Sequence, residues 1–330
     1  MTTTMDQTTS EGAEPGQRSR RPSRPKRPAQ QRRRPLPRRM RPRPPAPTAP
    51  PGPADNTAAV LSSAFTMVAI VCLWAAVQML FLSSVSQNRA QDLLYDQFRH
   101  EMGGATAPLG PVVPVGDPVA VITIPSIGLE QVVVEGTASG DLLVGPGHRR
   151  DTALPGQVGS SVVYGRAATY GAPFADLTEL ALGDKVVVAM GQGRKVFRVN
   201  DVRRAGDPLP QPVAEGGARL TLVTAEGSGR LGALAPESVV YVDADAKKGF
   251  PAPSGRAPAV PQSEQSMEGD SSALPLLALC LALLLAVTLG VIAARQRWST
   301  ALVWVVATPL VIALSWVTTD VVMRLLPNLI

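Results

Sequence analysis

Residues 220–225 read Leu-Thr-Leu-Val-Thr-Ala, and this stretch decides the fold expected for the chain. Most of it lies within 218–224, a stretch with the signals of a β-strand. Six further stretches carry a similar signature, at 119–127, 131–135, 160–164, 185–190, 195–202 and 238–242. The one helical candidate among them, 174–180, is short. So many short strands within about 130 residues predict a mainly β fold, a closed or nearly closed β-barrel.

The chain begins with a segment of a different composition. Residues 1–57 are rich in proline and carry a dense run of arginines, with almost no aliphatic side chains. Such a segment buries too little apolar surface to offset the entropy lost on folding. We therefore expect a disordered basic tail, which largely accounts for the sequence pI of about 9.7.

Three long apolar runs predict transmembrane helices, at 58–83, 273–294 and 301–320. A helix of about 20 residues, rising about 1.5 Å per residue, crosses a hydrocarbon core of about 30 Å. Basic loops favour the cytoplasmic side. The arginine tail and the turn 295–300, which holds Arg295 and Arg297, both lie there only if 84–272 is extracytoplasmic. The expected protein is therefore a multi-pass protein of the cell membrane, with the tail cytoplasmic and the end, 321–330, outside.

The extracytoplasmic part divides into three pieces. Residues 84–116 predict a juxtamembrane helix and a linker, because Leu93, Leu94 and Phe98 recur at roughly helical spacing before a run rich in glycine and proline. The predicted barrel takes 117–248. Residues 249–272, rich in Pro, Ser and Gly, are expected to form a second linker.

Several short sequence motifs within the predicted barrel occur in an order that is characteristic when they are taken together. They are Ile-Pro-Ser-Ile-Gly-Leu at 124–129, Gly-Pro-Gly-His at 145–148, Ser-Val-Val-Tyr-Gly at 161–165, Thr-Tyr-Gly-Ala-Pro-Phe at 169–174 and Thr-Leu-Val-Thr at 221–224. Together they resemble the sortase family of Gram-positive cell-surface transpeptidases, in an actinobacterial-type form. The resemblance covers about 117–245 and implies an eight-stranded barrel with an extracytoplasmic site.

The resemblance also implies a catalytic cysteine, a histidine as proton donor and an arginine that steadies the oxyanion. Here Ala225 stands at the nucleophile position and Arg166 at the histidine position, while Arg230 is the nearest candidate for the arginine. We therefore expect a sortase-like pseudoenzyme without catalytic residues. Its former cleft offers possible contacts at Tyr164, Arg166, Thr224 and Arg230 for an extended peptide or an anionic wall component. The alternative for Arg166 is a surface arginine without a ligand.

Few other residues could serve as nucleophiles or metal ligands. Cys72 and Cys280 lie in predicted spans, where burial disfavours the thiolate. His100 and His148 stand alone, so no metal-ligand spacing occurs and no metal or cofactor is expected. An active transpeptidase or hydrolase with a non-standard nucleophile, Thr224 or Ser228, remains the alternative to a pseudoenzyme.

The expected role follows from the predicted topology and the missing chemistry. The basic tail next to a membrane span indicates contact with anionic lipid of the bilayer, and nucleic acid is not an expected partner. The barrel is expected to bind or scaffold a cell-surface or cell-wall protein, or an active sortase. Asp320 is the one acid near the outer end of the third span. It is expected to face water, with a helix-pairing contact as the alternative.

Overall fold

The computed structural model describes residues 65, 69, 72–227, 236–294 and 296–330. The predicted tail and 12 of the 26 residues of the first predicted span lie outside this part of the chain, as do Ser228 and Arg230. The end of that first span is helical and includes a π-helical turn, Gln78–Leu82.

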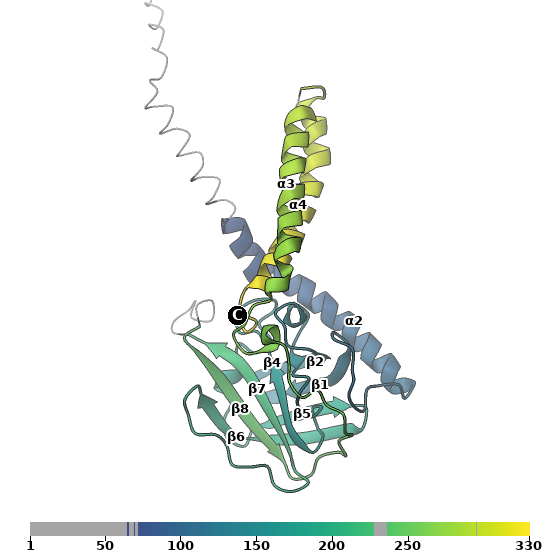
Figure 1. Cartoon of the computed structure of the whole chain (residues 1–330), viewed down its shortest axis with the longest axis vertical. Coiled ribbons are helices and arrows are strands. Elements are labelled where there is room, and N and C mark those ends of the chain that lie inside the picture. Colours follow the sequence, from purple (N-terminus) through teal and green to yellow (C-terminus); the bar gives the residue numbers. More distant parts are fainter. Residues whose placement is uncertain (1–64, 66–68, 70–71, 228–235, 295) are drawn as a thin grey trace, which may run out of the picture. The chain divides into compact units, whose positions relative to one another are not determined.

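The predicted juxtamembrane helix is present as α2, Ser83–Gly103. Its Phe98 packs with Val121 and Val132 on the outside of the barrel. The side-chain amide of Gln91 also bonds both backbone groups of Val132, at 2.7 and 3.1 Å. Figure 1 shows α2 lying along the barrel, and these contacts hold it there.

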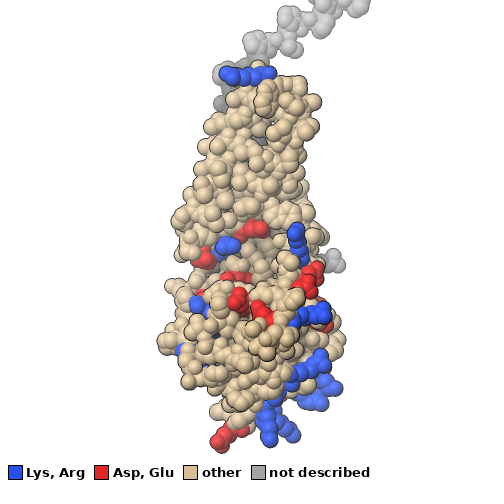
Figure 2. Space-filling model, turned by 90° about the vertical axis from the view of Figure 1, so that its right-hand side faces the viewer, with Lys and Arg blue, Asp and Glu red and all other residues tan. Residues whose placement is uncertain are grey.

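Two long helices close the chain, α3 (Leu274–Ala294) and α4 (Thr300–Leu325). The stretches Ser271–Ala294 and Ala301–Leu325 are long and apolar enough to cross a membrane. Cys280 is buried where these helices meet, with Val321 and Ala273. On the face drawn in Figure 2, the helical part is almost free of charge, whereas charged side chains gather over the barrel. A membrane-anchoring helix pair fits this distribution.

Eight strands close into a barrel in the order β1-β2-β3-β4-β7-β8-β6-β5. Their bounds are β1 Pro118–Ile124, β2 Leu129–Glu135, β3 Gly147–His148, β4 Gly159–Tyr164, β5 Lys185–Met190, β6 Gly193–Arg204, β7 Ala218–Glu226 and β8 Ser238–Ala246. The pairs β2–β3 and β4–β7 are parallel, and the other six pairs are antiparallel. The predicted eight-stranded barrel is confirmed.

The apolar core explains why the strands lie where the sequence pattern predicted them. Inward side chains such as Ile122, Phe197 and Leu220 are fully buried in one apolar cluster. All seven predicted strands are present, while β3 was missed, because two residues are too few to show alternation. The helical candidate 174–180 is only a 3-10 turn, Leu177–Glu179.

The segment expected as the second linker packs on the barrel. Val158 donates its N–H to the carbonyl of Phe250 at 2.9 Å. Further along, Glu264 is buried at 4% exposure. The chain between β8 and α3 thus runs over the barrel and contributes side chains to its surface.

Candidate functional site

The parallel pair β4–β7 brings together the two stretches that lead to Arg166 and Ala225. Tyr164 pairs with Val223 at the end of β4, and the next N–H, of Gly165, donates to the carbonyl of Val223 at 3.0 Å. Arg166 and Ala225 each follow this last pairing by two residues. The hydroxyl of Thr224 donates to the carbonyl of Gly165 at 3.1 Å. Tyr164, Arg166, Thr224 and Ala225 therefore lie at the same end of this strand pair, while Arg230 lies outside the described residues.

Ala225 sits in an apolar environment. It is buried at 4% exposure, in a cluster with Leu142, Tyr164, Ala167, Val223, Val239 and Leu329. We call this group, apart from Leu329, the Ala225 site. Its methyl group offers neither a nucleophile nor a proton, so the position contributes packing.

Arg166 is fully buried, which makes the surface alternative wrong. Its Nη2 donates to the carbonyl and the hydroxyl of Ser139, at 2.8 and 2.9 Å. Its Nη1 donates to the hydroxyl of Thr169 at 3.1 Å and to the backbone oxygen of Ile330 at 2.8 Å. Burial lowers the pKa of Arg166 to about 10, so the guanidinium stays charged at neutral pH.

Gly165 directs the chain into this arrangement. A Cβ at this residue would lie 2.3 Å from the Phe174 ring, so no side chain fits without moving the ring. The N–H of Phe174 donates to the carbonyl of Arg166 at 3.0 Å. Together these contacts fix the backbone from which the Arg166 side chain enters the interior.

The last described residues fill the space around Arg166 and Ala225. Leu329 is fully buried in the Ala225 site, and its carbonyl accepts the N–H of Ala167 at 2.9 Å. The backbone oxygen of Ile330 accepts the Thr169 hydroxyl at 2.6 Å as well as the Arg166 guanidinium. Segment 326–330 (Leu-Pro-Asn-Leu-Ile) is therefore part of the site.

Asn328 fixes this segment from the other side. Its amide nitrogen donates to the carbonyls of Thr137 and Gln265, both at 2.8 Å. Its side-chain oxygen accepts the N–H of Met267 at 3.0 Å, and its own N–H donates to the carbonyl of Glu268 at 3.0 Å. Sequence analysis missed this role. A proline and an asparagine directly after an apolar helix were the only signal, and they indicate no more than the end of the helix.

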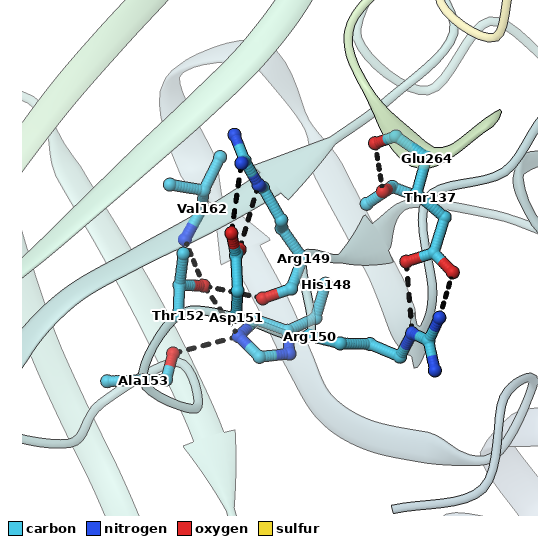
Figure 3. Close-up of polar contacts among 9 residues, drawn as sticks. All are labelled: Thr137, His148, Arg149, Arg150, Asp151, Thr152, Ala153, Val162 and Glu264. Atoms are coloured by element: carbon cyan, nitrogen blue, oxygen red, sulfur yellow. Dashed lines mark hydrogen bonds and ion pairs between the residues drawn. The ribbon is translucent and has the colours of Figure 1, made fainter. Parts of the chain in front are cut away.

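Arg149 and Arg150 do not join Arg166. Arg149 pairs with Asp151, its Nη2 lying 3.0 Å from Oδ2, and Arg150 forms an ion pair with Glu264 (Figure 3). Glu264 also accepts the Thr137 hydroxyl at its carbonyl, at 2.7 Å. Burial raises the pKa of Tyr164, and the nearby Arg149 opposes this shift.

His148 is not placed as a base for Thr224. Its Nδ1 lies 2.8 Å from Oε2 of Glu135, and its Nε2 lies 2.8 Å from the carbonyl of Ala153. A general base needs a ring nitrogen within reach of the hydroxyl that it activates. The Thr224 hydroxyl donates instead to Gly165. Within the described part of the chain, no group of His, Cys, Asp and Glu side chains could hold a metal ion.

A contact with α4 completes the surroundings of Arg166. The hydroxyl of Tyr170 donates to Asp320, and the Arg166 guanidinium lies 5.6 Å from the centre of the Tyr170 ring. Burial raises the pKa of Tyr170, and the hydrogen bond to Asp320 adds to this. Asp320, which is half-buried, thus contacts the barrel through Tyr170, a contact that the sequence did not predict.

Comparison with known proteins gives one family. A family model for the Sortase domain matches residues 122–243. A sortase transpeptidase of Clostridium perfringens is 20% identical and covers 49% of this chain and 98% of its own, with a TM-score of 0.39. The SrtF sortase of Corynebacterium diphtheriae is 22% identical, covering 48% and 98%, with a TM-score of 0.37. Sortase E of Streptomyces avermitilis is 28% identical, covering 46% and 100%, with a TM-score of 0.33. No curated protein matches at the level searched.

Proposed function

We propose that this chain, whose residues 122–243 match a model of the Sortase domain, is a sortase-family protein anchored in the membrane and a pseudoenzyme. Its barrel binds or scaffolds at the cell surface instead of cutting a peptide. One observation carries this proposal: the nucleophile position holds the buried methyl group of Ala225, while both Nη atoms of Arg166, at the histidine position, are bonded to neighbouring oxygens.

The chemistry that a sortase needs has no substitute among the described neighbours. Removing the nucleophile of a catalytic triad costs a factor on the order of 10⁶ in rate. Arg166 does not replace a histidine, because a guanidinium keeps its proton under ordinary conditions and cannot act as a base. Thr224 is 1% exposed and its hydroxyl is bonded to Gly165. These contacts support a non-catalytic role.

The proposed location follows from the helices. With α3 and α4 in the bilayer and basic residues on the cytoplasmic side, the barrel lies outside the cell and the tail inside. The proposed partner is a cell-surface or cell-wall protein, or an active sortase. The barrel surface, which carries the charged side chains seen in Figure 2, is available to such a partner.

A peptide-transfer assay tests the absence of catalysis. The full chain in detergent micelles is mixed with a sorting-signal peptide and an amine acceptor. We expect product no higher than with a boiled sample. Turnover that is lost in Thr224→Ala or Ser228→Ala would overturn the proposal and favour an enzyme with a non-standard nucleophile. Turnover that both variants retain would overturn it as well.

The scaffolding role needs a separate test in living cells. A photo-cross-linking amino acid is placed at Val196, which is 49% exposed on β6. We expect cross-links to a defined cell-surface protein. The matched control places the same group at the buried neighbour Phe197 and should give none. Identical patterns from the two positions would argue against a barrel-borne interaction.

A further inference from the structure

We propose that the Ala225 site is a peptide-binding site whose resident ligand is the chain's own segment 326–330. This inference rests on the proposed function only in that the site performs no chemistry on the peptide it holds. It goes further in naming what the site recognises: a peptide turn, in which the N–H of Ile330 donates to the carbonyl of Pro327 at 3.4 Å, that places an asparagine before a leucine.

The backbone of the segment is held in a sequence-independent manner. Ala167 donates its N–H to the carbonyl of Leu329, while Arg166 and Thr169 both donate to the backbone oxygen of Ile330. Hydrogen bonds to the backbone of a peptide give affinity whatever its side chains are, and side-chain pockets give specificity. The groups that supply them follow directly on β4, so the barrel itself presents them.

Two side chains of the segment make contacts that depend on their identity. Leu329 has no exposed surface and lies among the apolar side chains around Ala225 and Tyr164. Asn328 also has no exposed surface, and its amide is satisfied as donor and as acceptor by three backbone groups. A side chain without this donor and acceptor pattern would leave buried backbone groups unpaired, which is how polar sites reject near-isosteres. The site therefore selects Asn followed by Leu.

The helix before the segment keeps it next to its site. The Ser139 hydroxyl donates to the carbonyl of Met323 at 2.7 Å, and Tyr170 donates to Asp320. α4 ends at Leu325, so no linker separates it from the segment. A short tether gives a ligand an effective concentration on the order of millimolar or higher. A free peptide of the same sequence should therefore compete poorly with the resident segment.

Thiol labelling tests the resident ligand directly. Leu329→Cys is made in the full chain and treated with a membrane-impermeant maleimide. Its matched control is Leu182→Cys, at a leucine that is 72% exposed. We expect labelling of the L329C variant to be slower by about tenfold or more, because it requires local opening. Equal rates would overturn the proposal. Protection that is lost on dilution would assign the segment to a second copy, and would overturn it too.

Peptide exchange tests the recognition. A fluorescent peptide Leu-Pro-Asn-Leu-Ile is titrated against the wild-type chain and against Leu329→Glu, in which the resident segment is weakened by a buried charge. We expect the L329E variant to bind the peptide at least about tenfold more tightly than the wild type does. A peptide with alanine in place of asparagine should bind more weakly. Equal binding to both proteins, or none to a folded L329E variant, would contradict the proposal.

The two proposals fail separately. Turnover in the peptide-transfer assay would refute the pseudoenzyme while leaving labelling and exchange unaffected. Rapid labelling of L329C would refute the resident ligand while leaving the absence of turnover intact. If Leu329→Glu does not fold, the L329C measurement alone decides.

Discussion

Replacing Arg166 by methionine tests how much the chain depends on its buried guanidinium. Methionine approximates the length of the side chain but cannot donate a hydrogen bond. The change removes four hydrogen bonds, to Ser139, Thr169 and Ile330. It therefore tests the link between the barrel and segment 326–330 as well as the packing of the site.

The expected loss of stability can be estimated from the acceptors that remain. The carbonyl of Ser139 loses the donor that Arg166 supplies, whereas the backbone oxygen of Ile330 keeps the Thr169 hydroxyl. A buried acceptor without a donor costs about 1–3 kcal/mol, and each hydrogen bond to a charged group contributes about 1.5–3 kcal/mol. Removing the charge offsets part of this, because burial already disfavours it and lowers the pKa of Arg166 to about 10. We expect a net destabilisation of about 2–4 kcal/mol, somewhat below the ~3–5 kcal/mol of a broken buried ion pair.

Pulse proteolysis in urea, on the full chain in micelles, measures this difference. The matched control is Arg198→Met, since Arg198 is exposed and donates to the carbonyl of Gly183 at 3.2 Å. This control should stay within about 0.5 kcal/mol of the wild type. The Arg166→Lys variant should be destabilised almost as much as Arg166→Met, because a single ammonium group cannot reach the acceptors of both Nη atoms of the arginine. An R166M variant as stable as R198M would refute the reasoning.

Three further predictions concern the surroundings of this site. Burial raises the pKa of Asp141 to about 6. Between about pH 4 and pH 6, the folded state therefore keeps a proton on this carboxyl group that the unfolded state has lost. The contribution of Asp141 to the free energy of unfolding is complete below about pH 4 and declines as the pH rises to about 6. After a discount for partial exposure, the stability of the wild type relative to Asp141→Asn should fall by about 1–2 kcal/mol over that range in urea titrations, and a flat difference would contradict this. Tyr170→Phe removes the hydrogen bond to Asp320 and should destabilise the chain by about 1–2 kcal/mol, whereas Tyr95→Phe, at a tyrosine 39% exposed on α2, should not; equal melting temperatures would count against the contact. A reporter inserted after Ser271 should be digested by protease added outside intact cells, and its protection would reverse the proposed topology.

The barrel was predictable because its strands are long enough to show their pattern. β7 is buried at all of its residues from Ala218 to Ala225, and its string carried the resemblance to the family. The two-residue β3 was not predictable, because its place between β2 and β4 depends on pairing across the chain. Local sequence patterns predict single strands and helices, whereas the pairing that places β3 in the barrel depends on residues distant in the sequence.

The site was predictable in its positions but not in its contacts. The sequence identified Arg166 and Ala225 as neighbours through the family pattern. It could not show that Arg166 is buried, because an arginine is rarely interior unless its donors are satisfied. Those acceptors come from Ser139, 27 residues away, and from Ile330, 164 residues away. The contacts of segment 326–330 with the barrel also join residues distant in the sequence, and the composition of the segment does not predict them.

Arg166 and Ala225 both contact that segment, Arg166 through Ile330 and Ala225 through Leu329. A neutral imidazole has one N–H donor, whereas a guanidinium has donors on both Nη atoms, which here bond Ser139 on one side and Thr169 and Ile330 on the other. A side chain larger than that of Ala225 would compete with Leu329 for the same apolar space. Restoring Ala225→Cys and Arg166→His together should therefore give no peptide transfer while segment 326–330 stays in place. Transfer should begin only when Leu329→Glu is added, and full activity of the double variant alone would show that the segment does not close the site.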